Sequence, residues 1–167
     1  LTVGASLTTT TLAGCGAAGE LGDLDLRSDD PRRSIVTTYD DALATRNDAT
    51  TTRDEGVTAF NKRSYSDAID AIETALSGYE DGFAEAADLA TEIEEETAAD
   101  LCETAVDETA FQADATNAAL SAARAARNDA DAETINGHVE RFRSLRDDAA
   151  AIDIADADAV ASALGIE

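Results

Sequence analysis

The sequence is poor in the residues that most often carry out chemistry. It contains one histidine, two cysteines and no tryptophan or methionine, and aromatic residues make up 4% of it. It has no glycine-rich phosphate loop, nucleophile elbow or zinc-ligand pattern. His138 has a single acidic neighbour, Glu140, and indicates an interhelical or partly exposed histidine, not a catalytic base. We therefore predict no catalytic residues, no cofactor and no metal site.

Basic residues are also scarce. Twelve lysine and arginine residues stand against 36 aspartate and glutamate residues, which gives a formal net charge of −24 at pH 7. Because nucleic acids and anionic lipids carry phosphate, this charge argues against a nucleic-acid partner and against direct adsorption to anionic membranes. A high net charge is also typical of intrinsically disordered chains. The helical periodicity of most of the chain argues against that alternative.

Charge is absent from the opening run, residues 1–15. The run ends in Leu12-Ala13-Gly14-Cys15, which resembles a lipobox, the cleavage and lipidation site of prokaryotic lipoproteins. The resemblance implies that residues 1–14 are the remnant of a signal peptide and that Cys15 carries the lipid anchor. The run is too short for a transmembrane helix, which needs about 20 apolar residues. The alternative interpretation is a disordered N-terminus with an ordinary free cysteine.

Two further features bear on where the protein resides. The chain begins with Leu1 and lacks the basic region of a signal peptide, so we expect a start methionine and a basic stretch upstream. The lipobox, together with an acidic, aromatic-poor composition, resembles the surface lipoproteins of halophilic archaea. That resemblance implies a lipid-anchored protein at the extracytoplasmic face of the cell membrane, in molar salt. At 1 M salt the Debye length is about 3 Å, so repulsion between carboxylates is largely screened.

The rest of the chain divides into a tether and a helical domain. Residues 15–30 contain three glycines and five acids and predict a flexible tether with a reach of about 20 Å. Residues 31–167 predict an all-α, mostly antiparallel bundle of about four long helices and a short C-terminal one. The expected helices are 31–62, 65–93, 97–127, 132–151 and 156–164.

The first expected helix carries an irregular apolar stripe. Arg46, Thr50 and Arg53 interrupt the stripe. Residues 47–52 are poor in helix formers, so we expect a bend or break there.

The second expected helix has the most regular apolar pattern. Steps of four and three continue to Ile93 without interruption, as in a core-facing or coiled-coil-like seam, which is also the candidate binding surface. Gly78 and Gly82 lie off this seam and indicate a kink or a close helix approach. The seam begins with Tyr65, Ile69, Ile72, Leu76, Tyr79 and Phe83.

A local resemblance to a tetratricopeptide-like helix pair spans Gly56 to Leu76. Gly56, Tyr65, Ala68 and Ala75 stand at the spacing of that repeat, but a shift of 34 residues finds no second copy. A tight helical hairpin explains the same residues.

Two charged clusters and the second cysteine indicate structural roles. Residues 92–96 carry four acids in five residues and indicate a solvated face or a helix junction. Arg141, Arg143 and Arg146 form a basic island that we expect to pair with acids on a neighbouring helix. Cys102 indicates a small buried hydrophobe.

These observations favour a noncatalytic lipoprotein that acts as a protein-interaction or structural module. Its expected partners are the membrane, through the lipid anchor, and another protein. The alternative is a ligand- or solute-binding accessory lipoprotein of transport or sensing. That alternative needs a cleft lined by Tyr39, Tyr65 and Tyr79. An enzyme is a third option without a motif to support it.

Overall fold

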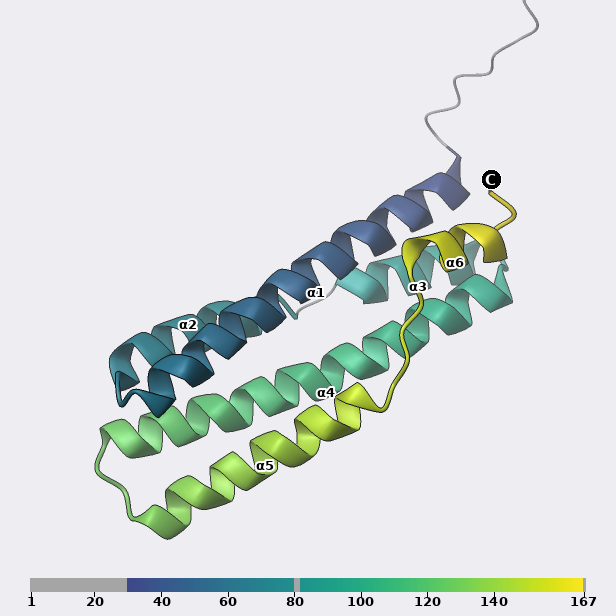
Figure 1. Cartoon of the computed structure of the whole chain (residues 1–167). Coiled ribbons are helices and arrows are strands. Elements are labelled where there is room, and N and C mark those ends of the chain that lie inside the picture. The colour runs from purple at the N-terminus through teal and green to yellow at the C-terminus, as the bar shows by residue number, and fades with distance from the viewer. Residues whose placement is uncertain (1–29, 80–81, 167) are drawn as a thin grey trace, which may run out of the picture.

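The structure, a computed structural model, describes residues 30–79 and 82–166. Within these ranges it contains six helices and no strand, which confirms the predicted all-α bundle (Figure 1). The predicted signal remnant, Cys15 and all but the last residue of the predicted tether lie outside the described residues. The helices are α1 (Pro31–Asn61), α2 (Tyr65–Ser77), α3 (Gly82–Glu92), α4 (Glu96–Arg127), α5 (Ala132–Ala150) and α6 (Ala157–Ala163).

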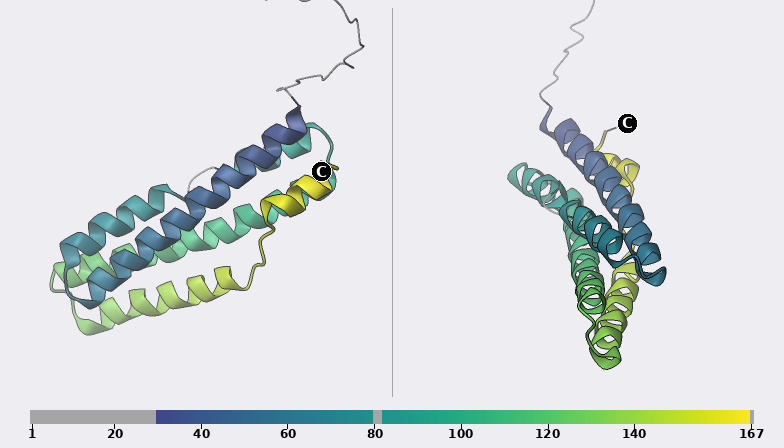
Figure 2. Two further views of the ribbon diagram at one scale, coloured as in Figure 1. Left: turned by 45° about the horizontal axis from the view of Figure 1, so that its top comes forward. Right: turned by 90° about the vertical axis from the view of Figure 1, so that its left-hand side faces the viewer.

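The bundle has two halves, which share the long helices α1 and α4 (Figure 2). In one half α3 and α6 pack against α1 and α4, around a core that contains Tyr39, Phe83 and Cys102. In the other half α2 packs against α1 and α4, whereas the backbone of α5 lies close to α4 alone. The core of this second half contains Ile72 and Phe142. Among the described helices none is long and apolar enough to cross a membrane.

Local signals account for three of the six helix starts. The side chain of Asp30 accepts a hydrogen bond from the Arg32 backbone N–H, and Pro31 follows in the first turn. Asp131 and Asp156 cap α5 and α6 in the same way, each accepting a backbone hydrogen bond of 2.8 Å. The bond from the Thr134 backbone N–H lowers the pKa of Asp131. These caps place the helix starts within one residue of the predicted positions.

The break that was one of the two expectations for residues 47–52 is wrong, because α1 continues through them. The hydroxyls of Thr50, Thr51 and Thr52 donate to backbone carbonyls four residues earlier, so these polar side chains are satisfied inside the helix. Ala49, in the same stretch, packs against Gly78 of the neighbouring segment. A Cβ atom added at Gly78 would lie 2.8 Å from the Ala49 Cβ. Tertiary packing therefore outweighs the weak helix propensity.

The prediction of one helix over residues 65–93 is also wrong, because α2 ends at Ser77 and α3 begins at Gly82. The backbone N–H groups of Gly78 and Tyr79 donate to carbonyls three residues earlier, which tightens the last turn of α2. Glycine disfavours helix continuation by about 1 kcal/mol relative to alanine. The close approach to Ala49 requires glycine at position 78. Four long helices and a short one thus become six.

The helices α1 and α2 form an antiparallel hairpin across residues 62–64 (Figure 1). Gly56 is buried at their contact, and a Cβ atom there would lie 2.6 Å from Ile72 Cγ1 and 3.2 Å from the Ala68 carbonyl oxygen. The absence of a side chain therefore lets the two backbones approach closely.

Candidate functional site

A chain of buried polar side chains connects α1 with α4. Arg46 Nε donates to Glu108 Oε2 at 3.1 Å, and Arg46 Nη2 donates to Glu108 Oε1. Gln112 Nε2 donates to the same Oε1 atom at 2.7 Å. Arg53 Nη1 in turn donates to Gln112 Oε1. Glu108 is 1% exposed and Arg53 is 3% exposed, so the connection lies inside the bundle.

Helical spacing places these four residues opposite one another. Arg46 and Arg53 are seven residues apart on α1, and Glu108 and Gln112 are four apart on α4, so each pair shares one helix face. The sequence marks the arginines as interruptions of an apolar stripe. The signal for their partners is weak, because Glu108 and Gln112 are two among several polar residues within an alanine-rich helix.

The network also reaches α5. The Arg53 Nε and Nη2 atoms donate to Asp54 Oδ1 at 3.1 and 3.0 Å, and its guanidinium lies 5.9 Å from the ring centre of Phe142. Among the described residues, every buried side-chain nitrogen or oxygen has a hydrogen-bond partner. The network is therefore an internal connection of α1 to α4 and α5, with no buried donor left over for a ligand.

The seam residues lie mostly in the core. Ile69, Ile72, Tyr79 and Phe83 are at most 6% exposed, whereas Tyr65 and Leu76 are half-buried. The break between α2 and α3 divides the seam between the two halves of the bundle. Ile72 therefore packs in one core cluster, and Phe83 packs in the other.

The three tyrosines do not line one cleft. Tyr39 is fully buried, donates a hydrogen bond of 2.9 Å to the Ala155 carbonyl and contacts the Phe83 ring. Tyr65 packs against Phe60. Tyr79 shares a hydrogen bond of 3.0 Å with Thr50 and borders a surface hollow of about 540 Å³ beside the connection between α2 and α3.

Cys102 and His138, the remaining candidates for chemistry in the sequence, lie on different helices, α4 and α5. Cys102 is a buried free thiol, and burial raises its pKa to about 11. Burial raises the pKa of Tyr39 to about 12, helped by the Cys102 thiolate that forms at high pH and by the carboxylates of Asp156 and Glu108. His138 is half-buried on α5. A thiol with a raised pKa is a poor nucleophile near neutral pH.

The acidic cluster at residues 92–96 is the junction between α3 and α4, as one of the two interpretations predicted. Glu94 has a φ of 60° at the turn, and Glu95 forms an ion pair with Arg32. Within residues 30–79 and 82–166, no group of three or more His, Cys, Asp or Glu side chains is placed to hold a metal ion.

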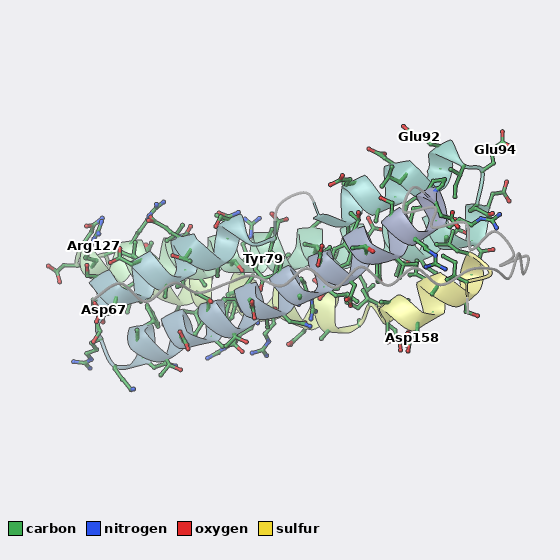
Figure 3. All side chains as sticks on the ribbon, turned by 90° about the horizontal axis from the view of Figure 1, so that it is seen from above. Asp67, Tyr79, Glu92, Glu94, Arg127 and Asp158 are labelled. Carbon is green, nitrogen blue, oxygen red and sulfur yellow. The ribbon has the colours of Figure 1, made fainter. Side chains whose placement is uncertain are left out.

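Charge is distributed unevenly along the bundle. Glu92, Glu94 and Asp158 lie at one end, and Asp67 and Arg127 lie at the other, with Tyr79 between them (Figure 3). Eight of the twelve basic residues belong to the half that contains α2 and α5. They are Arg53, Lys62, Arg63, Arg124, Arg127, Arg141, Arg143 and Arg146.

A groove of about 200 Å³ opens in this more basic half, between α1 and α5. We call it the α1–α5 groove. Apolar side chains form most of its surface, and Arg143 and Arg146 of α5 line it as well. Arg146 pairs with Asp147 on its own helix, so the expected pairing of this arginine with a neighbouring helix is wrong. The full lining is Val57, Phe60, Asn61, Ile72, Ala119, Ala122, Val139, Phe142, Arg143 and Arg146.

The fold and these surfaces define an acidic, all-α helical bundle with a satisfied polar core and one basic, apolar groove. Comparisons with protein-family models, curated proteins and solved structures gave no match to the chain.

Proposed function

We propose that the protein is a noncatalytic lipoprotein, anchored through Cys15 at the extracytoplasmic face of the cell membrane, and acts there as a protein-interaction module. The observation that carries the proposal is the position of the groove relative to the attachment point. The predicted tether enters at Pro31, and α1 is 31 residues, or about 46 Å, long. Val57 and Phe60, at the other end of α1, line the groove.

The charge distribution supports the same orientation. The end at which α1 begins also holds the acidic α3–α4 junction and Asp158 (Figure 3). The carboxylates at this end oppose direct contact with anionic headgroups, so the tether holds the bundle near the membrane without adsorption of its surface. The more basic half, with the groove, then faces away from the membrane and is accessible to a partner.

Replacing Cys15 with serine is expected to release the protein from the membrane into the medium. Serine cannot accept the thioether-linked lipid, and two acyl chains supply about 0.8 kcal/mol per buried CH2 group. Fractionation of cells that express the wild-type and C15S proteins measures the effect, with Cys102→Ser as the matched control. Equal membrane retention of the C15S protein would refute the anchor.

Transfer from molar salt to about 0.1 M salt is expected to reduce the helical content. Within residues 30–79 and 82–166 five ion pairs are present, so most of the acids in these ranges have no cationic partner there. Their mutual repulsion increases as the Debye length grows from about 3 to about 10 Å. Circular dichroism during a salt titration measures this loss. A spectrum that is unchanged across the titration contradicts the halophilic interpretation.

A further inference from the structure

We infer that the α1–α5 groove binds an acidic amphipathic helix of a partner protein. This inference rests on the proposed function, because it names the partner class of a protein-interaction module. Three observations support it, namely the open position in the bundle, the size of the groove and the charge at its rim.

The open position is visible when the two halves of the bundle are compared. In the first half, α6 packs against both α1 and α4 (Figure 2). Val160 of α6 and its C-cap residue Leu164, four positions later, are 0% and 2% exposed, because they insert into the core. In the second half, the backbone of α5 lies close to that of α4 but not to that of α1, and side chains such as Arg53 and Phe142 span the wider gap between α1 and α5. The groove therefore lies where a further helix would complete the second half as α6 completes the first.

The helix α6 also indicates what kind of helix fits. It begins at the cap Asp156, carries Asp158 in its first turn and inserts two apolar side chains at positions i and i+4. Helix-in-groove recognition uses anchors of this spacing. A volume of about 200 Å³ is below the usual range of about 300 to 1,000 Å³ for small-molecule sites. The groove is thus better matched to one or two large inserted side chains than to a whole ligand.

The groove surface has an apolar interior and a cationic rim. Ile72 and Ala122 are 1% and 2% exposed, whereas Val139 and Phe60 on the walls are half-buried. Arg143 is exposed at the rim, and the Arg146 guanidinium lies 5.8 Å from the ring centre of Phe142. Guanidinium groups bind carboxylates in bidentate geometry. A guanidinium–carboxylate contact is short-ranged, so it favours an acidic helix at this rim even where molar salt screens the net charge of −24 over longer distances.

Binding of a synthetic helical peptide tests the inference in molar salt. The peptide has about 18 residues, with leucine on one helical stripe and glutamate on both sides of it. We expect fluorescence anisotropy to detect binding to the whole protein, and Arg143→Glu to weaken it at least about tenfold. Arg141→Glu makes the same charge change on an exposed residue of α5 that does not line the groove. It should alter affinity by less than about twofold.

A second variant tests the apolar part of the groove. Val139→Trp places a large side chain at a half-buried wall position and is expected to abolish peptide binding. Circular dichroism and thermal unfolding establish that each variant is folded. A variant that unfolds is replaced by Val139→Leu, for which a partial loss of affinity is expected. Unchanged affinity in a folded Val139 variant overturns the inference.

Three other results also overturn it. The first is no binding of the glutamate peptide at millimolar concentration. The second is a lack of charge or position specificity, seen either as equal affinity for a peptide with lysine in place of every glutamate or as an equal loss of affinity in the R141E and R143E proteins. The third is tighter binding of octanoate, with displacement of the peptide, which would assign the groove to a small amphiphile.

Photo-crosslinking on intact membranes separates failure of this inference from failure of the proposed function. Crosslinkers at Asn61 and Arg143 report on the groove, and crosslinkers at exposed positions of the other helices report on the remaining surface. Protein adducts only from outside the groove contradict the groove assignment and leave the interaction function standing. No protein adduct from any position contradicts the interaction function itself.

Discussion

Replacing Arg46 with methionine is expected to lower the free energy of unfolding by about 3 to 5 kcal/mol. The change removes both guanidinium hydrogen bonds to Glu108, which is 1% exposed. Within the part of the chain that the structure describes, the other hydrogen bond to this carboxylate comes from the neutral amide of Gln112. An uncompensated buried charge is costly, because the interior cannot replace the water that the carboxylate lost. Urea unfolding at constant molar salt, followed by circular dichroism, measures the difference.

Two control proteins identify the buried charge as the cause. The R46M/E108Q double variant removes both charges and keeps an acceptor for Gln112, so it should be more stable than R46M alone. Arg32→Met breaks the ion pair with Glu95, in which the arginine is 48% exposed, and should cost at most about 1 kcal/mol. If the effects of R46M and E108Q simply add, the two side chains are not coupled and the role assigned to their pair is wrong.

Raising the pH from 9 to 12 is expected to destabilise the bundle through two buried acids. Burial raises the pKa of Cys102 from 9.0 to about 11 and that of Tyr39 from 10.0 to about 12. In the unfolded chain both groups lose their protons at the lower values. The unfolded state therefore binds fewer protons across this range, and the free energy of unfolding falls as the pH rises. Each group contributes up to about 2 to 3 kcal/mol.

Variants that cannot ionise isolate these contributions. Cys102→Ala should flatten the pH dependence mainly between pH 9 and 11, and Tyr39→Phe should flatten it mainly between pH 10 and 12. Tyr39→Phe also loses the hydrogen bond to Ala155, so its slope with pH, not its absolute stability, is the quantity to compare. Urea unfolding at a series of pH values gives these slopes. A double variant with the wild-type slope would show that other groups cause the alkaline loss.

The buried network explains why an interrupted stripe still belongs to the core. Judged from α1 alone, Arg46 and Arg53 weaken an apolar face. In the folded chain, Arg46 pairs with Glu108, which lies 62 positions later in the sequence, on α4. Arg53 pairs with Gln112, which lies 59 positions later on the same helix. Such pairs depend on which helix faces meet, and no local pattern in the sequence specifies that choice.

The same reasoning applies to the candidate site. The apolar residues and arginines of the groove are visible in the sequence, but they come from α1, α2, α4 and α5. They meet because the backbone of α5 packs closely on α4 and leaves a wider gap to α1. The three tyrosines do not form the expected cleft for a related reason. Tyr39 is buried in the core, where its hydroxyl donates a hydrogen bond to the distant Ala155 carbonyl.

The sequence by itself determined the fold class, the positions of most helices and the aspartate caps of three of them. These features depend on contacts within a few residues, such as the Asp131 side chain with the Thr134 backbone and the 3.6-residue apolar period. Only the tertiary structure decided that α1 remains continuous, that the second helix breaks after Ser77 and that the groove stays open. Each of these outcomes depends on interactions between distant segments, such as the close approach of Gly78 to Ala49, which outweigh local propensities of about 1 kcal/mol or less.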